Sequence, residues 1–357
     1  MSFCLTASAD RVESRPLRDE PQRRRQILRE LGPSFSLHDT DHFLVFHDTQ
    51  RDWATQRGRL LEKSHDQFYT TMQQAGWPVR PLRRRLVCVL FHDRKRFSEY
   101  ARSTDRLLEH WPNGYYSSST NRIAFYNDAT SAELRKFGAS IQRQQNRLDQ
   151  LYLRLQDTPG PAQPARRGAI EAQNQSLQRQ LEGQRRQQWL IVERANAAKT
   201  THEAVHQLAF NSGLQKRGVA YPFWMVEGLA TNFESRDLNR PFGLGVDNPT
   251  RRTMLRRAAQ RGELVPLGQL VVIVKPAKQS NAQRNTLYAQ AWGLFRYLFE
   301  RRRPQLLQLF RFHATVHGGQ VGPEALRQAF ADAFGPLEAV EAGWTRYVAG
   351  LKAQERR

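Results

Sequence analysis

The chain has 357 residues, of which 55 are Lys or Arg and 34 are Asp or Glu, giving a formal net charge of +21. Hydrophobic residues make up 39% and aromatic residues 10%, which excludes a disordered chain and allows a sizeable core. A positive surplus of this size favours contact with a polyanion, although a solvated basic surface needs no partner. No run of about 18 apolar residues occurs, so no transmembrane segment is expected.

The start of the chain only partly resembles a signal peptide. Its first ten residues have neither a charged segment nor a long apolar segment, but Ala7-Ser8-Ala9 resembles the small-residue end of a cleavage site. A start placed too far downstream would give this appearance. The two cysteines, Cys4 and Cys88, cannot form a disulfide framework or a cysteine metal site.

The first 130 residues predict a basic leader and then an α/β lobe. Residues 1–34 are rich in charge and are typical of a leader or a surface helix. In residues 35–130, helices alternate with strands, as expected for an α/β lobe with a small mixed sheet. We expect the strands, from their branched and aromatic residues, at 42–47, 85–91, 114–116 and 122–126.

Residues 131–197 have a different composition, rich in Gln and Arg and interrupted by a proline-rich turn at 159–164. Apolar residues recur at heptad-like intervals in two arms: Ile141, Leu148 and Leu155, then Leu177, Leu181 and Trp189. This spacing predicts an inserted helical hairpin that resembles a coiled coil. Such a hairpin could bind a protein partner, or it could be an ordinary helical pair packed on the body.

The residues that indicate chemistry begin with the sequence His-Glu-Ala-Val-His at 202–206. Because residues four apart share one face of a helix, His202 and His206 can bind one metal ion. Glu203 can then reach a water at that metal without becoming a ligand. A core-facing histidine pair or an exposed ion-pair cluster would give the same motif by chance.

A second helix supplies a third ligand. Glu227 lies in the sequence Trp-Met-Val-Glu-Gly-Leu-Ala at 224–230, and 20 residues separate it from His206. A catalytic zinc site has three protein ligands and one open position for water. His202, His206 and Glu227 therefore predict a site for one Zn²⁺, on zinc-binding helices within residues 198–237.

With these motifs the sequence resembles the gluzincin zinc metallopeptidases, the superfamily of thermolysin and of aminopeptidase-N-like enzymes. Over roughly residues 110–300 it is most similar to bacterial peptidase-MA-like proteins, which share the Trp-x-x-Glu-Gly-Leu-Ala pattern of 224–230. The resemblance implies zinc-dependent hydrolysis of a peptide or protein substrate, with Glu203 as general base. Together with the start of the chain, it favours an exported or cell-envelope location in a bacterium.

The same resemblance implies roles for two further segments. In residues 287–295, Tyr288 matches a tyrosine that stabilises the oxyanion, although an aromatic residue packed on a core helix would look the same. Gly114, Tyr115 and Tyr116 begin a segment that resembles the edge strand along which such enzymes place an extended substrate.

Two departures from the family pattern limit what it implies. The Gly-x-Met-Glu-Asn signature of the exopeptidases is missing from 114–126, which puts aminopeptidase activity in doubt. Thermolysin-like enzymes carry an Asp four residues after the ligand Glu to orient a zinc-bound His, and here that position is Thr231. A hydroxyl can accept from an imidazole N–H, with less electrostatic support than a carboxylate. Glu234 is more typical of a surface or supporting residue than of a ligand.

Residues 238–357 predict a helical C-terminal lobe, with helices at 250–261, 285–302, 305–314, 323–334 and 337–351. His313 and His317 are expected to cap a helix end. The other histidines suggest no ligand set: His42, His47, His65, His92 and His110. Together, these patterns predict an α+β fold, with a small mixed-sheet lobe, an HExxH helix, an inserted helical hairpin and a helical C-terminal lobe.

Two other functions are compatible with the sequence. A non-catalytic scaffold of the gluzincin type could use its basic surface and its hairpin to hold a polyanion or a protein partner, but it would need none of the residues of the metal motif. A nucleic-acid-associated protease would use the +21 surface, although no nucleic-acid-binding motif is visible.

Overall fold

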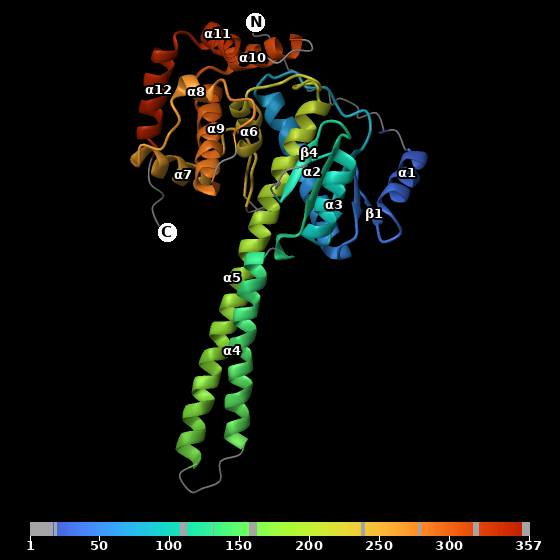
Figure 1. Cartoon of the computed structure of the whole chain (residues 1–357), viewed down its shortest axis with the longest axis vertical. Helices are drawn as coiled ribbons and strands as arrows, with labels where there is room; N and C mark the ends of the chain where they lie inside the picture. The colour runs from blue at the N-terminus through green and yellow to red at the C-terminus, as the bar shows by residue number, and fades with distance from the viewer. Residues whose placement is uncertain are drawn as a thin grey trace, which may run out of the picture.

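The structure, a computed structural model, describes residues 17, 20–107, 113–130, 132–156, 163–236, 240–277, 280–316 and 321–351. The protein has an α+β fold, in which a sheet lobe lies beside a helical lobe and a long helical hairpin projects from both (Figure 1). Most of the predicted leader lies outside the described residues, and its last part forms the surface helix α1 (Pro21–Leu31).

The sheet lobe contains a five-stranded mixed sheet with the order β1-β2-β3-β5-β4. Its strands are β1 (Ser36–Asp39), β2 (Phe43–His47), β3 (Leu86–Phe91), β4 (Gly114–Ser117) and β5 (Arg122–Tyr126). The central strands β2, β3 and β5 run parallel, while β1 and β4 pair antiparallel at the two edges. Strands β2 and β3 are buried along their whole length, as is usual for parallel strands covered on both faces.

Alternate residues of the central strands face two separate apolar clusters. Phe43 and Val45 of β2 pack toward the main core, which also includes α2 (Arg51–Gln74) and the helical lobe. Leu44 and Phe46 pack on the other side, against α1 and α3 (Arg94–Asp105). Cys88 is a buried free thiol in the main core. A short 3₁₀ helix, η1 (Asp128–Thr130), leads from β5 into the hairpin.

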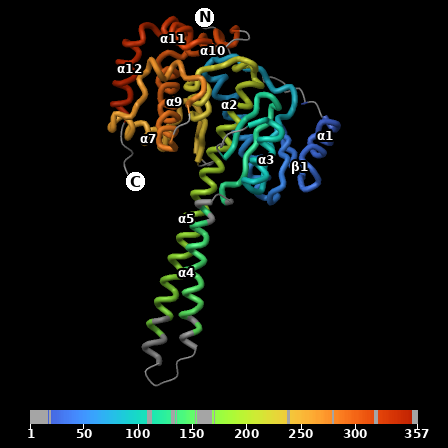
Figure 2. The backbone as a smooth tube through the Cα atoms, viewed as in Figure 1, coloured from blue at the N-terminus to red at the C-terminus, as the bar shows by residue number. Residues whose placement is uncertain are grey.

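The hairpin consists of α4 (Ala132–Gln156) and α5 (Gln163–Asn211), which pack together and extend far from the body (Figures 1 and 2). Helix α5 is 49 residues long and continues without a break from the hairpin into the body. The boundary predicted between residues 197 and 198 therefore divides a single helix. No Gly or Pro lies between Gly183 and the end of α5, so nothing in the local sequence ends the helix there.

The helical lobe is built around α9 (Asn281–Arg301), against which α6 (Phe223–Asn232) and α7 (Pro249–Gln260) pack. The remaining helices are α8 (Leu267–Leu270), α10 (Arg303–Thr315), α11 (Pro323–Phe334) and α12 (Leu337–Ala349). All five predicted helices of this lobe are present, within four residues at each end. Within the described parts of the chain, no helix combines the length and apolar character needed to cross a membrane.

Candidate metal centre

The C-terminal part of α5 carries the HExxH motif and is held in place from two sides. Ala204, Val205 and Leu208 are fully buried in the main core. On another face, the side-chain amide of Gln207 donates to the carbonyl oxygen of Val87 at 3.1 Å and to that of Asn121 at 2.8 Å. These contacts fix both the position and the rotation of α5 against the sheet.

Helix α6 brings Glu227 to the motif because it can approach α9 very closely. A Cβ added at Gly228 would lie 2.7 Å from the carbonyl oxygen of Ala291 and 2.7 Å from the Cβ of Phe295. Only glycine fits at this crossing. The Asn232 amide ties the end of α6 to α9 by donating to the Trp292 carbonyl oxygen at 3.0 Å.

The three predicted ligands converge on one point. Nε2 of His202 lies 3.0 Å from Oε2 of Glu227 and 3.1 Å from Nε2 of His206, and the third side, from His206 Nε2 to Glu227 Oε2, is 3.6 Å. Donor atoms bound about 2.0–2.2 Å from a tetrahedral metal lie about 3.3 Å from one another. The donor triangle therefore has the size that a divalent metal ion requires.

The electrostatics of the site also favour a cation. Burial opposes a charge on His202, but the carboxylates of Glu227 and Glu234 outweigh it and raise its pKa to about 10. The pKa of Glu227 is held well below its ordinary value by the two imidazoles, despite burial. Two nitrogens and one carboxylate oxygen in a buried setting form a donor set that fits zinc and related divalent metals.

Glu234, not Thr231, supports His202. Oε1 of Glu234 lies 3.1 Å from Nδ1 of His202, while the Thr231 hydroxyl donates to the carbonyl oxygen of Glu227 at 2.6 Å. In this arrangement the Thr231 hydroxyl bonds within its own helix, and Glu234 occupies the place beside Nδ1 of His202. Arg251 donates to both oxygens of Glu234, at 2.6 and 2.8 Å.

Arg251 and His202 keep Glu234 ionised. Burial opposes the charged carboxylate, but the arginine and the imidazole lower its pKa to about 2. The position of Glu234, seven residues after Glu227, was the only indication of this role in the sequence. No sequence pattern pointed to Arg251.

Glu203 lies beside the donor triangle without joining it. Its carboxylate has no hydrogen-bond partner in the part of the chain that the structure describes, although the residue is only 8% exposed. Burial raises the pKa of Glu203, against the opposing effect of the two histidines. A carboxylate with raised basicity and no protein partner is suited to exchange a proton with a water molecule.

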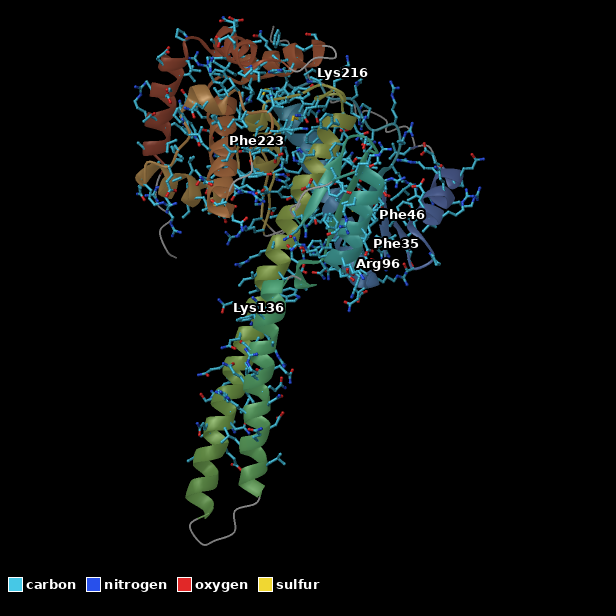
Figure 3. The ribbon with its side chains drawn as sticks, viewed as in Figure 1. Phe35, Phe46, Arg96, Lys136, Lys216 and Phe223 are labelled. Carbon is cyan, nitrogen blue, oxygen red and sulfur yellow. The ribbon has the colours of Figure 1, made fainter. Side chains whose placement is uncertain are left out.

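Tyr288 lies at the same site. Its ring centroid is 6.1 Å from that of His202 and 5.2 Å from that of Phe223, a residue labelled in Figure 3 at the start of α6. The Cζ atom of Arg251 lies 5.5 Å from the centre of the ring. Burial and the carboxylates of Glu227 and Glu203 raise the pKa of Tyr288 far above its ordinary value, so its hydroxyl stays protonated and can donate.

The expected substrate segment is the edge strand β4, which packs beside α5. A Cβ at Gly114 would lie 3.0 Å from the Lys199 side chain, one turn before the metal motif. The Tyr115 hydroxyl donates to Asp105 at 2.7 Å, and the ring of Tyr116 stacks on Phe210 at 5.4 Å. Both tyrosine side chains thus pack within the body, and the backbone edge of β4 is what this segment offers a ligand.

Three further residues with possible ligand atoms lie together, although the sequence gives no sign of such a group. Candidate donor atoms of His42, Glu62 and His65 lie within 4.8 Å of one another. Sequence reasoning missed them because His42 precedes β2 while the other two lie on α2. The imidazoles stack at 3.5 Å with planes 17° apart, so their in-plane lone pairs do not converge, and Glu62 accepts from the backbone N–H of His42 at 2.7 Å. This group is better suited to tying α2 to β2.

The expectation that His313 and His317 cap a helix is also not met where it can be followed. His313 is 1% exposed, and its ring lies 5.7 Å from that of Tyr221. His317 and His110 lie outside the described residues.

Comparison with known proteins adds one match. The model of a family described as a protein of unknown function (DUF1570) matches residues 196–317. This region is about a third of the chain and contains the three candidate ligands, Glu203, Glu234, Arg251 and Tyr288. No curated protein matches the chain.

Proposed function

We propose that the protein is a zinc-dependent metallopeptidase of the gluzincin type. The observation that carries this proposal is the donor triangle of His202, His206 and Glu227, whose sides of 3.0–3.6 Å match a tetrahedral metal. Beside it lie a protonated phenol and the Glu203 carboxylate, which has no hydrogen-bond partner among the residues that the structure describes. Peptide hydrolysis requires a base for water and a donor for the oxyanion, and these groups could supply both.

Each residue has a separate task in this reaction. When bound, zinc supplies the Lewis acidity that makes a water nucleophilic near neutral pH. Glu203 accepts the proton of the attacking water and returns it to the leaving amine. The hydroxyl of Tyr288 donates to the oxyanion that develops on the peptide carbonyl. The edge strand β4 would hold an extended substrate by backbone hydrogen bonds.

The alternative function is a non-catalytic scaffold that holds a polyanion or a protein partner. The charge of +21 and the projecting hairpin favour it. Neither feature requires a buried donor triangle or the Arg251–Glu234 pair that supports His202. Burying so many charged groups costs free energy, and such clusters occur chiefly at functional sites, so we place peptide hydrolysis first.

The test is cleavage of a broad peptide mixture by the zinc-loaded chain, with products identified by mass spectrometry. We expect the wild type to generate new termini, and Glu203→Gln to keep its zinc and lose activity by roughly 10²–10⁴-fold. Turnover by Glu203→Gln at the wild-type rate would remove Glu203 as the base. A folded, zinc-loaded wild type that cleaves nothing in the mixture would favour the scaffold.

A further inference from the structure

A polar pocket of about 350 Å³ lies next to the metal centre. Its wall is formed by α5 at Arg194, by residues 232–236 at the end of α6, and by residues between 240 and 250, which lead into α7. Glu234 lines this pocket and also contacts His202, so a ligand in the pocket would lie one side chain away from a metal ligand.

Three arginines line the pocket: Arg194, Arg236 and Arg240. The carboxylates on the same wall are already engaged, Glu234 by Arg251 and Asp247 by Arg252. Within the described chain, neither Arg194 nor Arg236 has an ion-pair partner. Among the residues that the structure describes, Arg194 and Arg236 therefore give this pocket positive charge that no carboxylate pairs with.

The crowding of these cations is itself unfavourable. Burial lowers the pKa of Arg236, and the neighbouring charges of Arg251 and Arg194 lower it further, against the effect of Glu234. An anion placed between Arg194 and Arg236 would relieve this repulsion. A carboxylate suits the site best within a peptidase, because the planar guanidinium binds it through two parallel hydrogen bonds.

We propose that this pocket binds an acidic side chain of the substrate, so that the enzyme prefers peptide segments rich in Asp or Glu. This inference rests on the proposed peptidase function and adds a substrate class to it. The clustered charge also attracts acidic segments from solution and raises their local concentration at the metal centre.

The experiment measures binding separately from cleavage. The probe is a short fluorescent peptide with several Glu residues, and its matched control has Gln at the same positions. Both are titrated by fluorescence anisotropy into the full-length, zinc-loaded Glu203→Gln protein. Arg194→Gln/Arg236→Gln is compared with Arg301→Gln/Arg311→Gln. The control removes the same charge from residues of α9 and α10 that are equally exposed but do not line the pocket.

We expect the Glu peptide to bind at least tenfold more tightly than the Gln peptide, a difference of about 1.4 kcal/mol. The pocket double variant should lose this preference, while the control double variant should change the affinity less than about twofold. Equal weakening by the two double variants would attribute binding to overall charge and overturn the proposal. If the Glu peptide binds preferentially but the wild type cleaves no peptide, the acidic-side-chain pocket is supported and the peptidase function is rejected. If the wild type cleaves peptides and the pocket double variant cleaves them equally well, the peptidase function is supported and the pocket is rejected.

Discussion

The orientation of His202 depends on a residue that does not touch the metal position. An imidazole that donates from Nδ1 to the Glu234 carboxylate presents the lone pair of Nε2 toward His206 and Glu227. Arg251 holds that carboxylate through two hydrogen bonds. The chain Arg251–Glu234–His202 therefore fixes both the tautomer and the direction of one ligand.

Replacing Glu234 should weaken zinc binding more than replacing Thr231. In Glu234→Gln the imidazole keeps an acceptor but loses the negative charge, and we expect zinc affinity to fall about 10–100-fold. In Thr231→Val only the contacts of the hydroxyl with the carbonyl oxygens of Glu227 and Gly228 in α6 are lost, and the affinity should stay within about twofold. Competition with a chromophoric chelator measures both constants. Equal losses in the two variants would show that Glu234 has no special role.

At the scale of elements, α5 joins the hairpin to the metal centre and is tied to the sheet lobe at its root. Arg57, only 1% exposed, donates to Glu193 at 2.6 Å, and the Asn196 side chain accepts from the backbone N–H of Asp128 at 3.0 Å. Lys199 then donates to the carbonyl oxygen of Tyr126 at 2.6 Å. These contacts come at successive turns just before His202, so they set the helix in register with the sheet.

Helix α10 gives a prediction on pH and stability. Burial lowers the pKa of His313 to about 4, from an ordinary value of 6.5. In the unfolded chain His313 takes up a proton near pH 6.5, whereas in the folded chain it stays neutral until about pH 4. The free energy of unfolding therefore has its full contribution from neutral His313 above pH 6.5 and loses that contribution as the pH falls toward 4. Between pH 7 and pH 5 the loss should be about 2 kcal/mol.

Urea unfolding at the two pH values measures this loss. His313→Leu cannot take up the proton, so its free energy of unfolding should fall by about 2 kcal/mol less than that of the wild type over the same interval. The measurement compares how much the free energy of unfolding changes between the two pH values in each protein. A general destabilisation of His313→Leu at both pH values therefore does not affect the result. The same pH-dependent loss in both proteins would exclude His313 as the source.

Short-range patterns account for the parts of this structure that the sequence predicted. The apolar runs at β2 and β3 and the spacing of His202 and His206 are local properties, and the structure brings Glu227 to them as expected. The approach of Arg251 to Glu234, the stacking of His42 on His65 and the pocket at Arg236 depend on tertiary packing. No periodicity in one sequence encodes such contacts.

At the scale of the whole molecule, the hairpin and the body have separate apolar cores. The hairpin core contains Ile141, Leu148 and Leu181, and it shares no residue with the two clusters of the body. The candidate metal centre instead lies where the sheet lobe and the helical lobe meet, with its candidate ligands on α5 and α6 and Tyr288 on α9. The distances between these side chains therefore depend on how the sheet lobe and the helical lobe pack against each other.

The most direct test of this account is the zinc content of the purified chain, measured by elemental analysis on the wild type and on His206→Ala. We expect close to one zinc per wild-type chain and almost none in the variant, because two remaining ligands cannot hold the metal tightly. Circular dichroism should show that both proteins are folded. A folded, zinc-supplemented wild type without zinc, or a variant that retains it, would contradict the metal centre.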